Sequence, residues 1–499
     1  MKKVLWALLI CLLLAGCRSQ ASSNEVTGES ITVSVFDPMP KKAFLEEAAQ
    51  KYQELHPDVT VNIQAFADMP EIKTADNGDG KTVAMISKVG SLDESKPDYI
   101  NKINTELMSG QGADLIAVDV IPYYSYIEKG LFEDLGPLMA SLDMSDLRGN
   151  IIDAAKIGGK QYFLPLDYGF SLIAYEPSLF TEEQLRVLES SDSMTIEEMA
   201  DLAATSFDPG GEARMFSYSA GAMTTSLFDA LLSGDYMDYA DIPGKTSYIG
   251  DGSFAEMLET ALSYEEKGYI PASLKEGDGG PVMRSIDDPQ QPCYFKNSPG
   301  VALMNYFSNY YNKGKEGGLK NRIVTNGISM NDTDELMGLV KNSKGQIPFT
   351  TSQAYAMNAN SKNKELAWDF LKFLLSYEVQ MSSTLTMSGL PVNKKAFEDK
   401  ALLSASTGEI GFAASTTARQ NSEKADIGEI NLSESALKAL DAYKAAIEKY
   451  TAMLDFMPIT DETITSAIRV EAASFFKGQK TAESAANAIN GKVSLYLNE

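Results

Sequence analysis

The chain has 499 residues, of which 44% are hydrophobic and 22% are charged, and its formal net charge is −26. A chain this acidic repels phosphate backbones and anionic headgroups, which argues against nucleic-acid binding and against electrostatic docking on a membrane. Its single histidine, His56, leaves too few ligands for a zinc-type site and no base for a Ser-His or Cys-His nucleophile, so we expect neither a metal nor a cofactor.

Residues 1–16 have the form of a secretory signal. Lys2 and Lys3 precede an apolar run that is too short to span a bilayer and that ends in LAGC at residues 14–17. This ending resembles a lipobox, in which the thiol of Cys17 would accept a diacylglycerol and the signal would be cleaved before it. Residues 17–30 are mostly small and polar and predict a flexible tether. The sequence therefore predicts an exported protein, anchored by lipid to the outer face of the cell membrane.

The cysteines argue against a disulfide within the mature chain. Cys11 would leave with the signal and Cys17 would be acylated, so Cys293 would have no partner. We expect Cys293 to be a buried or incidental thiol rather than a reactive one. Cleavage would also bring the net charge to −28. Because charge would not hold such a chain at a membrane, the lipid is needed for that purpose.

The first part of the mature chain predicts a strand–helix–strand unit. Apolar residues alternate over 31–35 and again over 59–63, whereas those of 44–55 recur at helical spacing. This unit builds parallel sheets. A helix is expected near 100–109, and 113–118 predict an apolar strand suited to a sheet that is buried on both faces.

The alternation of strands and helices continues to the C-terminus. Further strands are expected at 162–166, 171–175, 301–304, 323–324 and 353–357, and further helices at 195–205, 223–233, 254–267, 365–377, 434–455, 460–477 and 481–497. Ser361 is a candidate cap for the helix at 365–377. A chain of this length should form more than one core, and two α/β lobes with a ligand cleft between them are the natural arrangement.

Several segments resemble, in order, the family 1 extracellular solute-binding proteins, a group that includes maltose-binding proteins. They are FLEEAAQKYQELHPD (44–58), INTELMSGQGADLIAVD (103–119), YIEKGLFEDL (126–135), residues 159–180, SKNKELAWDFLKFLLSYEVQ (361–380), GLPVN (389–393) and GQKTAESAANAI (478–489). They cover most of the mature chain, and their order behind a lipobox makes the resemblance specific. Residues 68–95 and 274–292 depart from the pattern as insertions.

The resemblance implies an α/β, two-lobed periplasmic-binding-protein-like fold of type II, with a hinge and an interlobe cleft. Lobe I would comprise 31–166 and 330–382, and lobe II would comprise 167–329 and 383–499. The chain would cross between the lobes near 167–174, 323–330 and 383–392. Such proteins close around a ligand without changing it chemically and deliver it to a separate permease, whose ATPase drives uptake. We therefore predict a monomeric, non-enzymatic carrier with an ABC permease as its partner.

The candidate ligand-binding residues follow predicted strands, where ligands bind in open α/β sheets. A sugar packs its C–H faces on aromatic rings and pairs its hydroxyls with carboxylates and amides. Residues of these kinds, at positions that line the cleft in the family, are Asp37, Asp119, Tyr123, Tyr124, Asp167, Tyr168, Asn305, Tyr306, Phe307 and Tyr310. Each has a structural alternative, such as a helix cap, a hinge turn or core packing. The expected ligand is a carbohydrate.

Three other functions stay open. The same scaffold could bind a polyamine, a peptide or an aromatic acid, and carboxylates beside aromatic rings would suit a polyamine. A co-receptor that presents its ligand to a sensor kinase would have the same sequence features. A secreted glycosidase would need two carboxylates, which the chain can supply, but the resemblance leaves no room for a catalytic domain.

Overall fold

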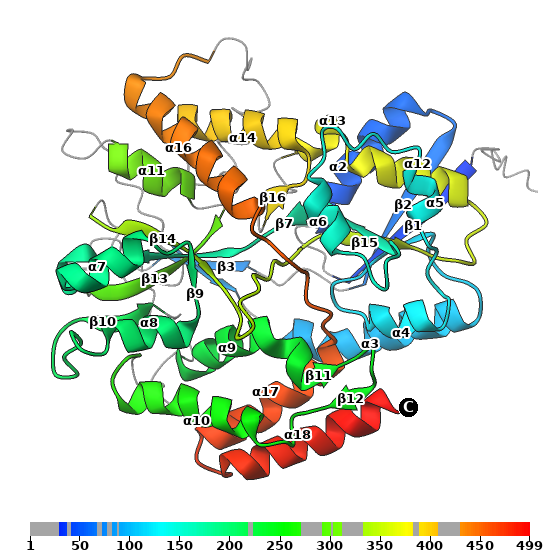
Figure 1. Cartoon of the computed structure of the whole chain (residues 1–499). Coiled ribbons are helices and arrows are strands. Elements are labelled where there is room, and N and C mark those ends of the chain that lie inside the picture. The colour runs from blue at the N-terminus through cyan, green and yellow to red at the C-terminus, as the bar shows by residue number, and fades with distance from the viewer. Residues whose placement is uncertain are drawn as a thin grey trace, which may run out of the picture.

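The computed structural model describes residues 29–36, 41–66, 72–76, 82–86, 89–217, 223–270, 292–300, 303–311, 333–382, 389–407 and 430–499. The signal, Cys17 and nearly all of the tether lie outside this part of the chain. So do Asp37, the crossing expected at 323–330 and all but the last residue of the expected insertion at 274–292. Two five-stranded sheets, each covered by helices, form the framework (Figure 1).

The first sheet has the strand order β2-β1-β5-β15-β6. Its strands are β1 (Glu29–Val35), β2 (Val59–Ala65), β5 (Leu115–Ala117), β6 (Phe163–Pro165) and β15 (Ala354–Met357). β1 runs parallel to β2 and β5, whereas β15 runs antiparallel to β5 and β6. The helix α2 (Ala43–Leu55) joins β1 to β2, which confirms the predicted strand–helix–strand unit. All three residues of β5 are buried, as its apolar sequence predicts.

The second sheet has the order β10-β13-β8-β14-β9. Its strands are β8 (Ser171–Tyr175), β9 (Ser193–Met194), β10 (Arg214–Ser217), β13 (Cys293–Pro299) and β14 (Glu335–Val340). The helices α7 (Glu182–Glu189), α8 (Ile196–Ala203), α9 (Met223–Tyr239) and α10 (Ser253–Glu266) contribute buried residues to its core. Three of these helices were predicted, and α9 continues past the expected end at 233.

Among the described residues, the remaining helices contribute to three hydrophobic cores, the third of which takes residues from α3 (Val89–Met108). The first core takes residues from α12 (Lys364–Leu374), α13 (Tyr377–Gln380), α14 (Lys394–Thr407) and α16 (Glu434–Thr451), and the second from α17 (Glu462–Phe476) and α18 (Ala482–Leu497). Figure 1 shows α14 and α16 along one edge of the molecule and α17 and α18 along the opposite edge. The helices of the chain after residue 389 therefore lie on opposite sides of the molecule.

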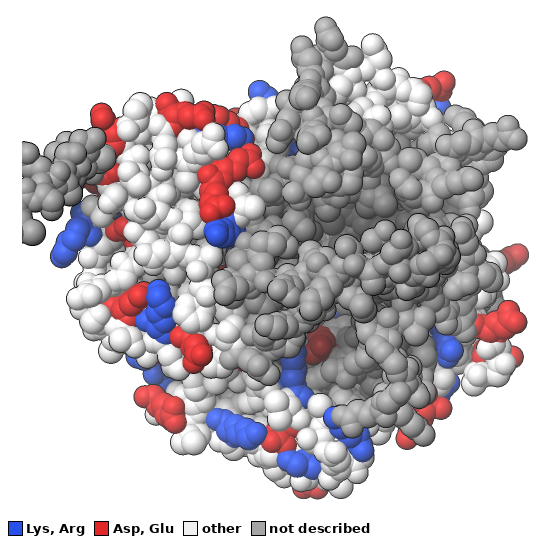
Figure 2. Space-filling view, turned by 180° about the vertical axis from the view of Figure 1, so that it is seen from behind, with Lys and Arg blue, Asp and Glu red and all other residues white. Residues whose placement is uncertain are grey.

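Shorter elements complete the fold. They are α4 (Tyr123–Glu128), α5 (Gly136–Met139), α6 (Gly149–Ala154), the 3₁₀ helix η2 (Pro177–Leu179), and the paired strands β11 (Ala240–Asp241) and β12 (Thr246–Ser247). Among the residues that the structure describes, no helix is both long and apolar enough to cross a membrane. Figure 2 shows basic and acidic side chains interspersed over the described part of one face, as on an ordinary solvated surface.

The chain passes from the first sheet to the second between β6 and β8, and this first crossing lies beside residues 390–391. β7 (Asp167–Tyr168) pairs antiparallel with β16 (Leu390–Pro391). The buried carboxylate of Asp167 accepts hydrogen bonds from the Thr351 hydroxyl at 2.9 Å and from the Gln353 backbone N–H at 3.0 Å. The hydroxyl groups of Tyr168 and Thr451 lie 2.9 Å apart, within hydrogen-bonding distance. These contacts join the first crossing to β16, to the segment that leads into β15 and to the end of α16. The crossing predicted at 383–392 lies partly outside the described residues and stays a prediction.

The structure departs from the predicted elements in three places. Within the expected insertion at 68–95, β3 (Ile72–Asp76) and β4 (Thr82–Ile86) form an antiparallel pair, and α3 (Val89–Met108) begins well before residue 100. The strand predicted at 301–304 is wrong, because Leu303 begins α11 (Leu303–Tyr311). Ser361 is not the N-cap of α12 either. Its hydroxyl donates to Asp114 at 2.6 Å and the helix begins after Asn363.

Candidate functional site

A cavity of about 490 Å³ lies between the two sheets. Its wall comes from segments far apart in the sequence. The lining residues include Val118, Asp119 and Tyr123 beyond β5, Gly169, Phe170 and Ser171 around the first crossing, Thr195–Glu197 at the start of α8, Asp229–Tyr236 of α9, Asn297, Val340–Ser343 after β14, Pro348–Thr351, Met457, Pro458 and Thr460, and Thr465 and Arg469 of α17. The volume is within the usual range of small-molecule sites, about 300–1,000 Å³.

The strand directions explain why these segments meet. The carboxyl ends of β5, β9 and β14 are followed directly by residues of the cavity wall. Ligands bind beyond the carboxyl ends of strands in open α/β sheets, because the loops and helix starts there present free backbone and side-chain groups. The turn between β7 and β8 brings the first crossing to the same place, where Gly169 and Thr350 exchange two backbone hydrogen bonds of 2.8 Å.

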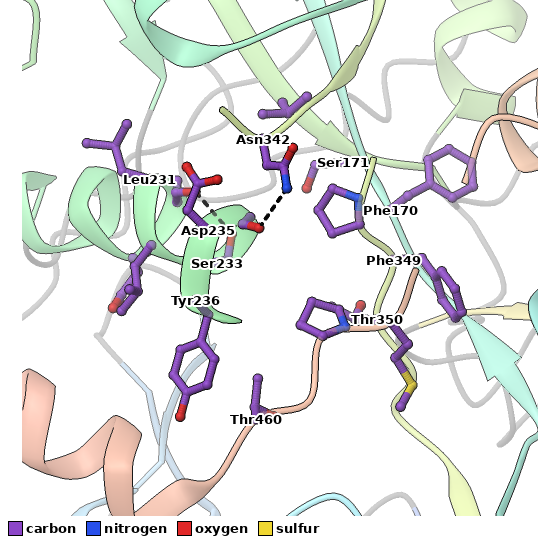
Figure 3. A pocket seen from close by; sticks show the side chains of 18 of the residues that line it. Phe170, Ser171, Leu231, Ser233, Asp235, Tyr236, Asn342, Phe349, Thr350 and Thr460 are labelled. Carbon is purple, nitrogen blue, oxygen red and sulfur yellow. Dashed lines mark hydrogen bonds between the residues drawn. The ribbon is translucent and has the colours of Figure 1, made fainter. Parts of the chain in front are cut away.

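The wall combines aromatic rings with hydroxyl and amide groups. In Figure 3 the labelled side chains surround an open space, with Tyr236 of α9 on one side and Phe170, Phe349 and Thr350 on the other. Ser171, Ser233, Thr460 and Thr465 add hydroxyls, and Asn297 and Asn342 add amides. A ligand that offers both apolar faces and several hydrogen-bonding groups fits such a wall.

Several polar groups of the wall are held in place by the protein itself. The Asn342 amide nitrogen donates to the Gly234 carbonyl at 3.2 Å, and its oxygen accepts from the Gln346 backbone N–H at 2.8 Å. The carboxylate of Asp235 accepts from the Ser343 hydroxyl at 2.8 Å. These bonds fasten the loop after β14 to α9, so this side of the cavity is built before any ligand arrives.

The charged groups of the wall occur mainly as ion pairs. Asp119 lies 2.5 Å from Lys41. Lys341 lies 2.9 Å from Glu198, and Arg469 Nε lies 3.5 Å from Asp229 Oδ1. Burial raises the pKa of Asp229, although Arg469 lowers it. Among the described residues, no cluster of histidine, cysteine, aspartate and glutamate has the arrangement of a metal site.

The predicted site residues in the first half of the chain fall into three groups. Asp119 and Tyr123 line the cavity. Tyr124, next to them on α4, is half-buried and packs at the border of two hydrophobic clusters. Asp167 and Tyr168 are fully buried and bonded to protein groups, and the wall begins only at Gly169. Burial raises the pKa of Tyr168 to about 12.

The predicted site residues near 305–310 lie on α11, which packs against α16. Tyr306 is buried and donates to the Asp334 carbonyl at 3.1 Å, and Phe307 packs against the first core. Tyr310 is 38% exposed. None of these three belongs to the cavity wall described above. Only the backbone of Asn305 is described, and Asp37 lies outside the described residues.

The sequence alone does not predict most of the wall that α9, α17 and the loop after β14 supply. Asp229 and Asp235 lie on α9 and Arg469 lies on α17, and a solvated position is the ordinary expectation for charged residues on helices. Asn342 and Ser343 lie in a short polar loop with no distinctive pattern. No local signal separates these residues from surface residues, because only the packing of α9, α17 and the loop after β14 within the second half brings them together.

Comparison with known proteins identifies the family. The family described as bacterial extracellular solute-binding protein matches residues 37–381. The erythritol/L-threitol-binding protein of Mycolicibacterium smegmatis is 23% identical over 310 residues, which are 56% of this chain and 59% of that protein. The lactose-binding protein of Rhizobium radiobacter is 24% identical over 293 residues, which are 54% of this chain and 58% of that protein. The chain thus spans less than two thirds of the length of these relatives.

Solved structures show the same fold over nearly the whole chain. An extracellular solute-binding protein of family 1 from Alicyclobacillus acidocaldarius has a TM-score of 0.55 at 12% identity, covering 95% of this chain and 99% of its own. The sugar-binding protein MalE of Xanthomonas citri has a TM-score of 0.55 at 13% identity. The match covers 94% of this chain and 97% of that protein. Maltose-bound MalE3 of T. maritima has a TM-score of 0.50 at 14% identity. The match covers 94% of this chain and 100% of that protein.

These structures confirm the predicted α/β fold of the periplasmic-binding-protein type, and the family match confirms the resemblance seen in the sequence. The chain belongs to the bacterial extracellular solute-binding proteins, which bind their solutes without chemically transforming them.

Proposed function

We propose that the chain captures a carbohydrate outside the cytoplasm and delivers it to an ABC permease. The observation that carries the proposal is the cavity between the sheets, whose wall combines hydroxyl and amide groups with the rings of Phe170, Tyr236 and Phe349. A sugar needs both kinds of partner. Because both halves supply the wall, a ligand that touches both stabilises the arrangement in which they are closer together.

The names of the related proteins support this ligand class. Erythritol, L-threitol, lactose and maltose, which appear in those names, are all neutral polyhydroxy compounds. They differ in size from a four-carbon alditol to a disaccharide. The proposal therefore concerns the class of ligand, and the size of the cavity is compatible with either end of this range.

Thermal unfolding of the purified chain without residues 1–17 tests the proposal. Erythritol, L-threitol, lactose and maltose serve as probes, because a ligand at 100 times its Kd stabilises the folded state by about 2.7 kcal/mol. We expect at least one of them to raise Tm by several degrees, and isothermal titration calorimetry then gives the Kd. If neither these probes nor a wider set of neutral sugars shifts Tm, the carbohydrate proposal is wrong.

A cationic solute such as a polyamine is the second candidate. Among the described wall residues, the carboxylates Asp119, Glu197, Asp229 and Asp235 outnumber the basic side chains. An excess of carboxylates favours a positively charged guest. Spermidine in the same assay separates the two candidates, because a shift with spermidine and none with any sugar would favour the polyamine.

We further propose that lipid on Cys17 holds the protein at the cell membrane. The support is the sequence LAGC at the end of the apolar run, together with an acidic chain that charge would not attract to a membrane. Cys17→Ser should abolish metabolic labelling with an alkyne fatty acid and release the protein into the soluble fraction. Cys293→Ser is the matched control and should stay labelled. Labelling that survives Cys17→Ser would contradict the anchor.

The permease partner is tested in cells. Uptake of the radiolabelled sugar identified by calorimetry should require both this protein and the permease genes. A co-receptor for a sensor kinase would instead leave uptake unchanged when the gene for this protein is deleted.

A further inference from the structure

The basic side chains of the cavity are already paired within the protein. Among the described residues of the wall, Lys341 and Arg469 are the two that carry a positive charge. Lys341 contacts Glu198 at 2.9 Å, and Arg469 contacts Asp229 at 3.5 Å. Glu198 is itself held by the start of α8, where it accepts from the Thr195 backbone N–H at 2.9 Å. The Lys341 pair is therefore part of the scaffold, whereas the Arg469 pair joins two side chains that both line the cavity.

The Asp229–Arg469 pair crosses from one helix to another. Asp229 lies on α9 and Arg469 on α17, and their side chains are 38% and 52% exposed. Both side chains are thus partly open to the cavity. A guanidinium in this position would otherwise be a suitable partner for a carboxylate on a ligand, because its planar donors match the two carboxylate oxygens.

An acidic ligand would meet unfavourable groups in the same cavity. The carboxylates of Asp119, Asp229 and Asp235 line it. Another carboxylate placed near them is repelled, and most strongly by Asp235, which is not in an ion pair with either basic side chain of the wall. The acid would also lose hydration on entry, without an unpaired cation among the described wall residues to replace it.

We propose that Asp229 is a specificity-determining residue that excludes acidic solutes by occupying Arg469. In this arrangement the cavity accepts neutral polyhydroxy ligands and rejects the corresponding carboxylates. The inference rests on the proposed carbohydrate function. It adds that the choice between a sugar and its acid depends on one ion pair rather than on the overall charge of the wall.

Matched pairs of ligands test the inference. Lactitol and lactobionate, maltitol and maltobionate, and erythritol and erythronate each compare a neutral alditol with the aldonic acid of the same open-chain skeleton, so that the two members differ in charge and not in ring form. For the pair whose neutral member binds, we expect the wild-type Kd of the acid to be at least 10-fold weaker at pH 7 and fixed ionic strength. Asp229→Asn should improve the Kd of the acid roughly 10-fold, because it frees Arg469, and should change that of the neutral member much less.

Asp235→Asn is the charge-matched control. Asp235 also lines the cavity, but it accepts a hydrogen bond from Ser343 and is not paired with Arg469 or Lys341. Its removal changes the charge of the wall by the same amount and should improve acid binding much less. In the double variant of Asp229→Asn with Arg469→Gln, the gain should disappear. Circular dichroism and Tm verify that each variant is folded.

The outcomes separate this inference from the proposed function. Equal gains in acid binding from Asp229→Asn and Asp235→Asn would show that only the overall charge matters and would overturn the role of the pair. Wild-type protein that binds an acid as tightly as its neutral partner would overturn it as well. If Asp229→Asn does not fold, Arg469→Gln tests the inference instead. The inference treats the guanidinium of Arg469 as a group that attracts acids, so better acid binding by Arg469→Gln would contradict it. Wild-type protein that binds none of the neutral probes would remove the proposed function and this inference with it.

Discussion

At the scale of single residues, Lys400 is an unusual buried charge. It lies on α14 with 6% of its surface exposed, and its ammonium group donates to the Ser382 carbonyl at 2.5 Å. The Ser382 hydroxyl in turn donates to Glu47 at 2.7 Å. Burial lowers the pKa of Lys400 to about 7, with Glu47 raising it and Lys51 lowering it further. The group therefore opposes folding at neutral pH, since its charged form is favoured in the unfolded chain.

The pH dependence of stability should reveal this residue. Between pH 7 and about 10.5 the unfolded chain binds more protons at this position than the folded chain, so stability rises with pH across that window. Below pH 7 the penalty is complete. Lys400→Met should therefore stabilise the protein by a few kcal/mol at pH 6–7, and the gain should shrink as the pH approaches 10.

Urea unfolding at several pH values measures this effect. Lys362→Met is the control, because Lys362 is exposed and should give no such pH-dependent gain. A Lys400→Met variant that is less stable than wild type at pH 6 would mean that the bond to Ser382 outweighs the burial of the charge.

At the scale of elements, two helices begin with the same capping arrangement. Thr181 caps α7 and Thr195 caps α8, and in both cases the third residue of the helix returns a side-chain bond to the backbone N–H of the cap. The two helices differ in position, because Thr195 lines the cavity and Thr181 does not belong to its described wall. A matched comparison can therefore separate helix stability from ligand binding.

Thr181→Ala and Thr195→Ala should each lower the free energy of unfolding by about 1 kcal/mol, because each leaves a backbone donor without its cap. Only Thr195→Ala should also weaken binding of the sugar, since loss of the cap loosens Glu198 and with it Lys341 at the wall. Chemical denaturation and calorimetry measure the two effects. Equal effects of both variants on Kd would contradict this local coupling.

Element by element, the sequence predicts regular structure where its periodicity is strong. The alternation in β1 and β2 and the helical spacing of α2, α12, α17 and α18 are borne out. The prediction fails at residues 301–304, whose short apolar run is compatible with a strand or with the start of a helix. The prediction also underestimates the length of α3, because Pro97 and many polar residues obscure the helical periodicity before residue 100.

At the scale of the whole molecule, the site could be predicted only where it follows strands. Asp119 and Tyr123 come directly after an apolar strand, and the structure places them at the cavity. Asp229 and Arg469 are 240 positions apart on two helices, and nothing in either local pattern indicates that they meet. Their proximity depends on how α9 and α17 pack, which is a property of the complete fold.

The chain packs closely against β7 at Gly389, next to β16. A Cβ atom at this position would lie 2.5 Å from Asp167 Oδ2 and 3.0 Å from the Tyr168 carbonyl oxygen. Gly389→Ala should therefore push β16 away from β7 and destabilise the protein by about 1–3 kcal/mol. It should also weaken sugar binding, because the first crossing continues into the cavity wall at Gly169 and Phe170.

Tm and Kd measure both consequences. Gly491→Ala is the control, because nothing lies within 4 Å of its added Cβ and the residue is within α18. That substitution should stabilise the helix by about 0.5–1 kcal/mol and leave the Kd unchanged. A Gly389→Ala variant with unaltered Tm would show that the crossing tolerates a wider spacing than its packing suggests.

The position of β15 has a consequence for the timing of folding. This strand sits between β5 and β6, although the chain reaches it only at Ala354, long after β6 ends at Pro165. At ordinary rates of protein synthesis, about 5–20 residues per second, the ribosome needs on the order of 10–40 s to cover that interval. The N-terminal half cannot complete its hydrogen-bonded framework during this time. The first sheet can therefore close only after the strands of the second sheet, up to β14, have been synthesised.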